Sequence, residues 1–412
     1  MNATPGPRGL ADLTPTDGRR AHVIKDDREA IEAARALSDD FAVEAAQRDQ
    51  DRRLPWPELE RLSASGLLAI TVPKSHGGPD VTPETLAEVF RLLAKADPSI
   101  AQIPHSHFVY INVLLEEGSP AQKEFFLAEV VAGKRIANAQ TERNTRHIKD
   151  LRTRLAKSED GGYILNGTKF YTTGALFADW LGVMAKGNDD LIYVAYVRRD
   201  SPGVAVDDDW DGLGQRTTAS GTVHLDNVQV DPTRVVPHHL TFDRPTRYGA
   251  LAQLLHTAIE VGIAGAALDE AAEFVRTKSR PWFESGLETA AEEPLLIQQF
   301  GELAIRVRAA EALLAQAARA VGAARQNLTD DTAAEASVAV AAAKAFAGEV
   351  AVEVSSAVFE VSGTRSALAT LNLSRHWRNA RTHSLHDPAR WKVQHIGRYV
   401  LNGTKPPRHG LL

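Results

Sequence analysis

The residues that could do chemistry gather near the C-terminus, between Arg378 and Pro388. This stretch reads Arg-Asn-Ala-Arg-Thr-His-Ser-Leu-His-Asp-Pro and holds two arginines and two histidines within eleven residues. Histidine is the side chain whose ordinary pKa lies nearest neutrality, so such a string can position anions and move protons. We therefore expect proton-transfer chemistry near His383 and His386.

The composition is that of an ordinary globular protein. The 412 residues, 43% of them hydrophobic, are enough for two or three domains with a buried core. The formal net charge of -6 shows no basic footprint, so we expect neither nucleic acid nor an anionic membrane as a partner. With no cysteine there is no disulfide, no thiol nucleophile and no Cys-zinc site. No run of about 18 apolar residues occurs, and we expect a cytoplasmic protein without a membrane span.

Hydrophobic periodicity divides the chain into helix, strand and helix. Residues 1–27 are polar, lack the apolar core of a signal peptide and are expected to form a flexible tail. Helical spacing in 28–135, short runs of period two in 136–242 and alanine-rich helical stripes in 243–398 follow, before a tail at 399–412. The expected fold is α+β but mostly α, with an N-terminal helical domain, a middle β barrel or sandwich and a C-terminal four-helix bundle.

One helix start is specific enough to assign to a residue. Thr82 can cap a helix with its hydroxyl, and Pro83 suits the first turn because its missing N–H would be unpaired there. Four apolar residues at helical spacing follow on one face: Leu86, Val89, Phe90 and Leu93.

Four short motifs follow one another along the chain. They are Val72-Pro73 before Gly77-Gly78, the run Asn-Gly-Thr-Lys-Phe-Tyr-Thr-Thr-Gly from Asn166 to Gly174, the helical segment from Gly262 to Arg280, and the segment from Arg378 to Pro388. Each motif alone is weak, but their order within the helix–strand–helix arrangement is specific. The chain resembles the acyl-CoA dehydrogenase superfamily from about residue 28 to 400, which implies an acyl-CoA dehydrogenase-like fold.

Within the superfamily the chain resembles the flavin monooxygenase branch, which includes dibenzothiophene monooxygenases and sulfur-acquisition oxidoreductases. The segment ending in His386-Asp387-Pro388, together with Trp391-Lys392 and the tail up to Gly410, carries this resemblance. It implies reduced FMN as cofactor, delivered by a separate NAD(P)H:flavin reductase, with O2 as one substrate. The other substrate would be a small organosulfur compound, oxygenated through a C4a-hydroperoxyflavin in sulfur acquisition.

The resemblance implies three catalytic residues. His386 would stand near the flavin peroxide, and a second active-site histidine would be His107, with His105 kept as the alternative because both lie in one short stretch. Thr173 would direct its hydroxyl at the flavin. On residue type alone, His386 would more often be a helix-end histidine paired with its neighbour, and it is the family position that favours function.

The resemblance also implies a set of cofactor-binding residues besides Thr173. Asn138 would place an amide beside the flavin ring, and Tyr171 would stack on the ring. Arginine binds phosphate through a fixed fork of donors, so Arg365, in the turn after Gly363, and Arg280 would reach the flavin phosphate. Arg280 would do so across a subunit boundary. A homotetramer is implied by the resemblance, while the alanine stripes alone require only some apolar partner.

Two other functions stay open. The first is an FAD-dependent acyl-CoA dehydrogenase in which Asp387 replaces the usual Glu base. The other helical position of that base, around 247–253, holds no acid. The second is a helical assembly protein that has lost its flavin. No G-x-G-x-x-G follows a strand, so electrons would come from the substrate or from a partner reductase. No residue pattern completes a familiar metal site, and we expect no metal.

Overall fold

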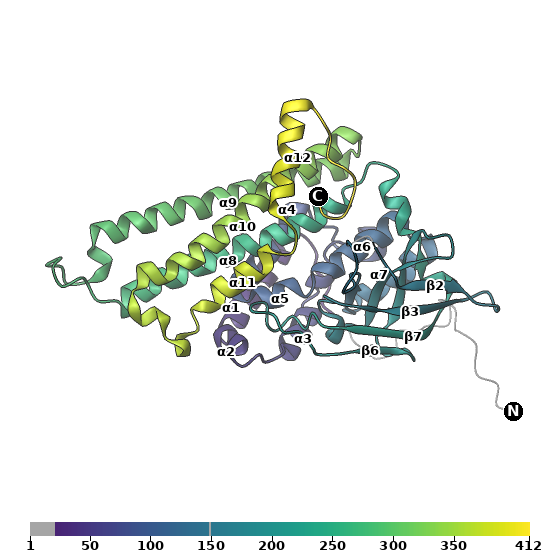
Figure 1. Ribbon diagram of the computed structural model, residues 1–412, viewed down its shortest axis with the longest axis horizontal. Coiled ribbons are helices and arrows are strands. Elements are labelled where there is room, and N and C mark those ends of the chain that lie inside the picture. Colours follow the sequence, from purple (N-terminus) through teal and green to yellow (C-terminus); the bar gives the residue numbers. More distant parts are fainter. Residues whose placement is uncertain (1–20, 148–149) are drawn as a thin grey trace.

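Helices form the first part of the chain in the computed structural model, which describes residues 21–147 and 150–412 (Figure 1). The N-terminal helices are α1 (Asp27–Ala42), α2 (Ala45–Gln50), α3 (Trp56–Ala64), α4 (Pro83–Ala96), α5 (Pro98–Gln102), α6 (His105–Glu117) and α7 (Pro120–Val131). Most of the expected flexible tail, residues 1–20, lies outside the described residues. The rest of it is packed, because His22 N donates to Ala64 O at 2.9 Å and Ile24 is buried.

The helix start predicted at Thr82 is confirmed. Thr82 Oγ1 accepts a hydrogen bond from Thr85 N at 3.3 Å, and Pro83 is the first residue of α4. All four apolar residues of the predicted face are buried. The helix α4 packs against α1 and α8, so this face connects the N-terminal helices to the C-terminal ones.

In the middle part, the described residues form eight strands of one hydrogen-bonded sheet. They are β1 (Ile136–Ala139), β2 (Arg154–Lys157), β3 (Tyr163–Lys169), β4 (Trp180–Lys186), β5 (Ile192–Arg198), β6 (Val204–Val206), β7 (Val223–Val230) and β8 (Val235–Val236). The order is β6-β7-β3-β2-β4-β5-β8, and β1 pairs with β4 in parallel, placing Asn138 opposite Gly182. The strand β1 also packs against α6.

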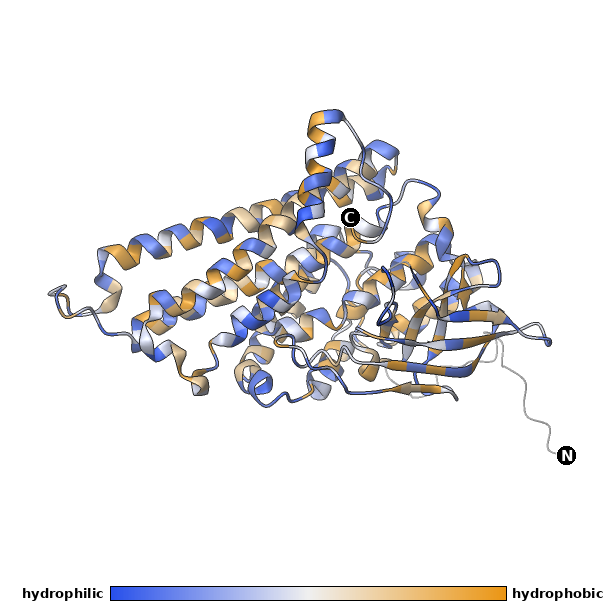
Figure 2. Ribbon diagram, viewed as in Figure 1, coloured by the Kyte–Doolittle hydropathy of each residue, from blue (hydrophilic) through white to orange (hydrophobic). Residues whose placement is uncertain are grey.

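Long helices form the last part. They are α8 (Tyr248–Lys278), α9 (Pro294–Gln326), α10 (Asp330–Ser362), α11 (Ser374–Ser384) and α12 (Ala389–Asn402). The bundle is built from α8 to α11, with α8 against α9, α10 and α11, and the expected mostly helical fold class is confirmed. Hydrophobic and hydrophilic residues alternate in bands along these helices and along the strands (Figure 2).

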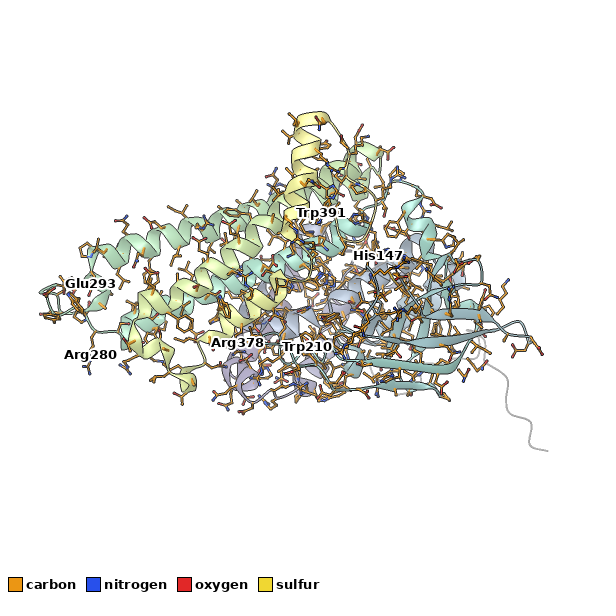
Figure 3. The ribbon with its side chains drawn as sticks, in the orientation of Figure 1. His147, Trp210, Arg280, Glu293, Arg378 and Trp391 are labelled. Atoms are coloured by element: carbon orange, nitrogen blue, oxygen red, sulfur yellow. The ribbon has the colours of Figure 1, made fainter. Side chains whose placement is uncertain are left out.

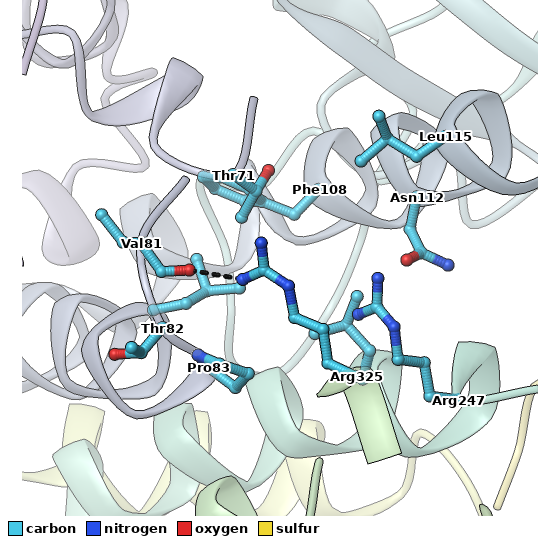
Figure 4. A pocket seen from close by; sticks show the side chains of 11 residues that line it. Thr71, Val81, Thr82, Pro83, Phe108, Asn112, Leu115, Arg247 and Arg325 are labelled. Carbon is cyan, nitrogen blue, oxygen red and sulfur yellow. Dashed lines mark hydrogen bonds between the residues drawn. The ribbon is translucent and has the colours of Figure 1, made fainter. Parts of the chain in front are cut away.

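The helix α8 is the core of the molecule. Every residue from Tyr248 to Ala264 is buried. It is long and apolar enough to cross a membrane, but 83% of its most apolar window lies buried inside the protein, as in a core helix. Close by, Arg325 of α9 donates to Val81 O at 2.8 Å and pairs with Asp80, which fastens the bundle to the N-terminal helices (Figure 4).

Candidate active site

A cavity of about 540 Å³ lies where the three parts of the chain meet. Side chains from α6, β1, α8, α11 and the loop between β6 and β7 line it, with backbone near the C-terminus closing one side. Four of the lining residues are histidines: His105, His256, His383 and His386. Among the described residues, no aspartate or glutamate lines the cavity. The chemistry of this site therefore depends on imidazoles, neutral polar groups and the guanidinium of Arg381.

Three of the four imidazoles lie in a row, here called the imidazole stack, in which His256 is stacked on His105 and tilted by 40° against His386. The His256 ring lies between His105, at a centroid distance of 3.9 Å, and His386, also at 3.9 Å. His105 Nε2 donates to Ala252 O at 2.9 Å, which fixes the orientation of that ring. His386 is 39% exposed at its side chain, so the stack runs from the protein interior to the solvent side of the cavity.

Of the two histidines of α6, His105 lines the cavity and His107 does not. His107 is 1% exposed and does not line the cavity. Its Nε2 donates to Leu68 O at 2.8 Å and its Nδ1 accepts from Ile136 N at 3.0 Å. Residues two apart on a helix point in different directions, and on α6 it is His105 that faces the cavity. His107 instead joins α6 to the start of β1.

Burial keeps the interior imidazoles neutral. It lowers the pKa of His105 to about 3 and the pKa of His256 well below its ordinary value. Burial also lowers the pKa of His383, although a hydrogen bond to Glu260 opposes this effect. At neutral pH each of these rings therefore carries one N–H and one lone pair.

A chain of hydrogen-bonded hydroxyls fixes the direction in which the Thr173 hydroxyl donates its proton. Thr218 Oγ1 donates to Gln215 O at 2.9 Å, so its only proton is used there. Ser220, 2.7 Å away, must then donate to Thr218, and Thr173 must donate to Ser220 across another 2.7 Å. The remaining lone pairs of Thr173 Oγ1 are left as acceptors at the cavity wall, which suits an N–H group of a ligand.

Asn138 and Tyr171 line the same cavity. Asn138 Nδ2 donates to Ser106 Oγ at 3.2 Å, and its side-chain oxygen accepts from Gln140 N. Tyr171 has φ of 58°, a left-handed conformation, and its ring is 55% exposed. The structure thus brings Asn138, Tyr171 and Thr173 together with His386, from segments far apart in the sequence.

Asp387 lies behind the cavity wall. It is 5% exposed, forms an ion pair with Lys392, and lies 3.5 Å from Nδ1 of His386. Burial alone would raise the pKa of Asp387, but His386 and the ammonium groups of Lys344 and Lys392 hold that pKa well below its usual range. A carboxylate kept ionised by a buried lysine is a poor base for a ligand it does not face.

The C-terminal motif also holds one wall of the cavity. Gly214 N donates to Thr382 Oγ1 at 2.9 Å, and Gln215 N donates to Asn379 Oδ1 at 2.6 Å. A Cβ on Gly214 would lie 2.0 Å from Arg378 O, so only glycine permits this approach. The loop that carries Trp210 is therefore fixed on α11 beside Arg378 (Figure 3).

Comparison with known proteins identifies the family. Models of the N-terminal, middle and C-terminal domains of acyl-CoA dehydrogenase match residues 25–134, 137–228 and 254–391. The dibenzothiophene monooxygenase of Rhodococcus erythropolis is 34% identical over 395 residues, covering 92% of this chain and 95% of that protein. The chain belongs to the acyl-CoA dehydrogenase family.

Two further relatives belong to the flavin monooxygenase branch. The probable FMNH2-dependent monooxygenase SfnC of Pseudomonas putida is 29% identical and covers 92% of this chain and 96% of that protein. FMN-bound TdsC from Paenibacillus sp. A11-2 has a TM-score of 0.89 at 31% identity, over 93% of this chain and all of that one. The predicted membership of this branch of the acyl-CoA dehydrogenase family is confirmed.

The cavity of this acyl-CoA dehydrogenase family member fits a flavin in its chemistry. Buried polar atoms without a partner in the described chain gather here: Gln215 Nε2 and Oε1, His256 Nε2, Tyr110 Oη and Gln102 Oε1. Buried polar groups are normally hydrogen-bonded, so these atoms indicate a ligand with donors and acceptors along its edges. Sequence reasoning missed Gln215 and His256, although His256 and Glu260 stand four apart in an apolar helix, a spacing that marks one face.

The predicted phosphate-binding residues lie elsewhere. Arg280 is exposed at the outer end of the bundle, far from Trp210 (Figure 3). Arg365 Nη1 donates to Lys278 O at 2.9 Å near the same end, and Gly363, with φ of 73°, ends α10 there. None of the three lines the cavity of its own chain. Among the described residues, no group of three or more metal-ligating side chains could hold a metal ion.

Protonation of the buried histidines should make the protein acid-labile. Burial lowers the pKa of His107 to about 4, whereas the unfolded chain takes up this proton near pH 6.5. Stability is therefore retained above pH 6.5 and falls as the pH drops toward 4, by up to roughly 1.4 kcal/mol per pH unit for each such histidine. We expect His107→Gln, which can keep both hydrogen bonds, to flatten the decline of the thermal midpoint between pH 7.5 and 4.5.

The matched control is His147→Gln, because His147 is exposed. The thermal midpoint of this variant should fall between pH 7.5 and 4.5 as steeply as that of the wild type. Equal declines for wild type and His107→Gln would contradict the assignment of His107 as a buried neutral residue.

Proposed function

We propose that this protein is a two-component monooxygenase that uses reduced FMN and O2 to oxygenate a small organosulfur compound. The observation that carries the proposal is a cavity of about 540 Å³ lined by four histidines and, among the described residues, by no carboxylate. An acyl-CoA dehydrogenase needs a carboxylate to remove a proton from its substrate. A flavin-dependent oxygenase needs groups that control the protonation of the activated oxygen, and it does not need a carboxylate base. The names of the relatives, FMNH2-dependent and dibenzothiophene monooxygenase, support the cofactor and the substrate class.

Reduced FMN, when bound, supplies two electrons to dioxygen, so that one oxygen atom enters the substrate and the other leaves as water. A separate flavin reductase would deliver it, since the chain carries no dinucleotide-binding motif. Thr173 would bind it through the acceptor lone pairs left by the hydroxyl chain. This polarity favours the reduced flavin, whose ring carries an additional N–H. Asn138 would hold the edge of the ring, and the exposed Tyr171 would cover its face.

The imidazole stack would control protons at the reacting atoms. His386, at the solvent side, can exchange protons through the opening, whereas His105 is buried and held neutral. Together with the loop that carries Trp210, the stack keeps bulk water from the ring, which prevents loss of the activated oxygen. Asp387 would position His386 and would not act as a base, so FAD-dependent dehydrogenation with Asp387 is the weaker proposal.

The flavin phosphate would be bound with the help of a second copy of the chain. Arg280 and Arg365 stand at one end of the bundle beside two exposed aromatic residues, Trp282 and Phe283, which are 61% and 78% exposed. Exposed aromatic side chains of this size mark an interaction surface. A homotetramer in which this end reaches the cavity of a neighbour would bring both arginines to the phosphate.

Thr173 gives a direct test of cofactor binding. Thr173→Val keeps the shape but removes the acceptor, and should raise the Kd for reduced FMN by roughly 5- to 10-fold, the value of one hydrogen bond. Thr173→Ser should bind nearly as the wild type does. Anaerobic titration with reduced and oxidised FMN measures both constants. Equal binding by the valine and wild-type proteins would rule out Thr173 as a flavin ligand.

His386 gives the test of the reaction. Enzyme loaded anaerobically with reduced FMN is mixed with O2 and dibenzothiophene or a small sulfone, and oxygenated product and H2O2 are quantified. We expect His386→Gln to lower product formation on the order of 100-fold and to release the oxygen as H2O2. His76→Gln, outside the cavity, is the control. Absence of oxygenated product from the wild type with every organosulfur compound tried would overturn the proposed function.

A further inference from the structure

A buried charged network extends from the cavity into the bundle. Glu260 follows His256 by one turn of α8, and the two residues are 0% and 1% exposed. Glu260 Oε1 accepts from Lys344 Nζ at 2.5 Å and from His383 Nδ1 at 3.1 Å. His383 Nε2 lies 3.0 Å from His256 Nδ1. The four side chains come from α8, α10 and α11, which pack side by side (Figure 1).

The carboxylate sets the direction of every proton in this network. An ionised Glu260 only accepts, so His383 Nδ1 carries the proton and donates it. In the neutral His383 ring, Nε2 then has a lone pair and accepts from His256 Nδ1–H. His256 Nε2 is consequently an acceptor, and it is buried, lines the cavity and has no partner within the described chain. One orphaned base thus ends the network where a ligand would lie.

We propose that His256, His383, Glu260 and Lys344 form a proton relay that takes one proton from a cavity-bound ligand at His256 Nε2 and later returns it there. As Nε2 gains the proton, His256 Nδ1 gives its own to His383 Nε2. His383 then carries the positive charge beside the carboxylate of Glu260. The reverse transfer restores the starting state, so the relay neither gains nor loses a proton over a cycle.

Other charged groups around the relay keep it neutral at rest. The Lys344 ammonium opposes protonation of both imidazoles, and it also acts on Asp387 together with Lys392. Burial would raise the pKa of Glu260, but the charge of Lys344 and the hydrogen bond from His383 lower it, so the carboxylate stays ionised. The neighbouring rings of His105 and His386 disfavour a charge on His256 itself. A proton entering the relay is therefore held on His383.

The role in the reaction rests on the proposed function. Oxygenation by reduced FMN and O2 gives oxidised FMN, oxygenated product and one water with no net change in protons. The relay would hold one proton out of the cavity until water is formed. Of the four residues, only His256 offers the ligand a nitrogen without a partner in the described chain, and His383, Glu260 and Lys344 act through it.

The test reads the two nitrogens of His256 in flavin-free enzyme. Histidine labelled with ¹⁵N distinguishes protonated from non-protonated nitrogens by solid-state NMR, and His256→Gln identifies the signals. At pH 7.5 we expect Nδ1 to be protonated and Nε2 not. After addition of reduced FMN without O2, we expect His256 Nε2 to be protonated, His256 Nδ1 not to be, and both nitrogens of His383 to be protonated. A protonated Nε2 in the flavin-free enzyme, or bound reduced FMN without exchange, would overturn the relay.

A paired substitution separates the relay from a structural ion pair. Glu260→Gln with Lys344→Met removes both charges together, so no buried charge is left alone, and it should abolish the exchange on His256. Glu142→Gln with Lys169→Met is the control, because Glu142 and Lys169 form another buried pair, at 2.8 Å, with no contact to His256. An unchanged exchange in the paired variant would overturn the proposal. Failure of reduced FMN to bind the wild type would count against the proposed function. The protonation of the two His256 nitrogens in the flavin-free enzyme would still decide the tautomer of His256.

Discussion

Burial of the Glu260 carboxylate at the centre of α8 is the constraint on which the site depends. A lone buried carboxylate is very costly, so Lys344 from α10 and His383 from α11 must approach it. That requirement sets how three helices pack and which face α11 turns to the cavity. It also decides which nitrogen of His256 carries the proton. The ion pair between Glu260 and Lys344 therefore fixes the direction of the hydrogen bonds as well as contributing to the packing of the helices.

The order of helices, strands and helices could be predicted because each element carries its own periodicity. The start of α4 could be predicted to the residue, since capping by Thr82 and the proline after it are local effects. That Thr173 and His386 line the same cavity could be predicted only from the family resemblance. Nothing local to either residue says that the loop after β3 and the end of α11 border one cavity.

What sequence reasoning missed depends on packing between distant segments. The choice between His105 and His107 rests on the rotation of α6 against β1 and α8, which the sequence does not state. His256 looked like one polar residue in an apolar helix, and it gains its role only when α11 supplies His383. Arg280 and Arg365 do not line the cavity of their own chain, and only the family resemblance connected them with the flavin phosphate.

We propose that this cavity, lined by four histidines and, within residues 21–147 and 150–412, by no carboxylate, serves to oxygenate a substrate and not to dehydrogenate it. The most direct measurement is mass spectrometry of the product formed from an organosulfur substrate, reduced FMN and ¹⁸O2. The account predicts one ¹⁸O atom in each product molecule and the other in water. Bound FAD that is bleached by an acyl-CoA, with no ¹⁸O in any product, would contradict it.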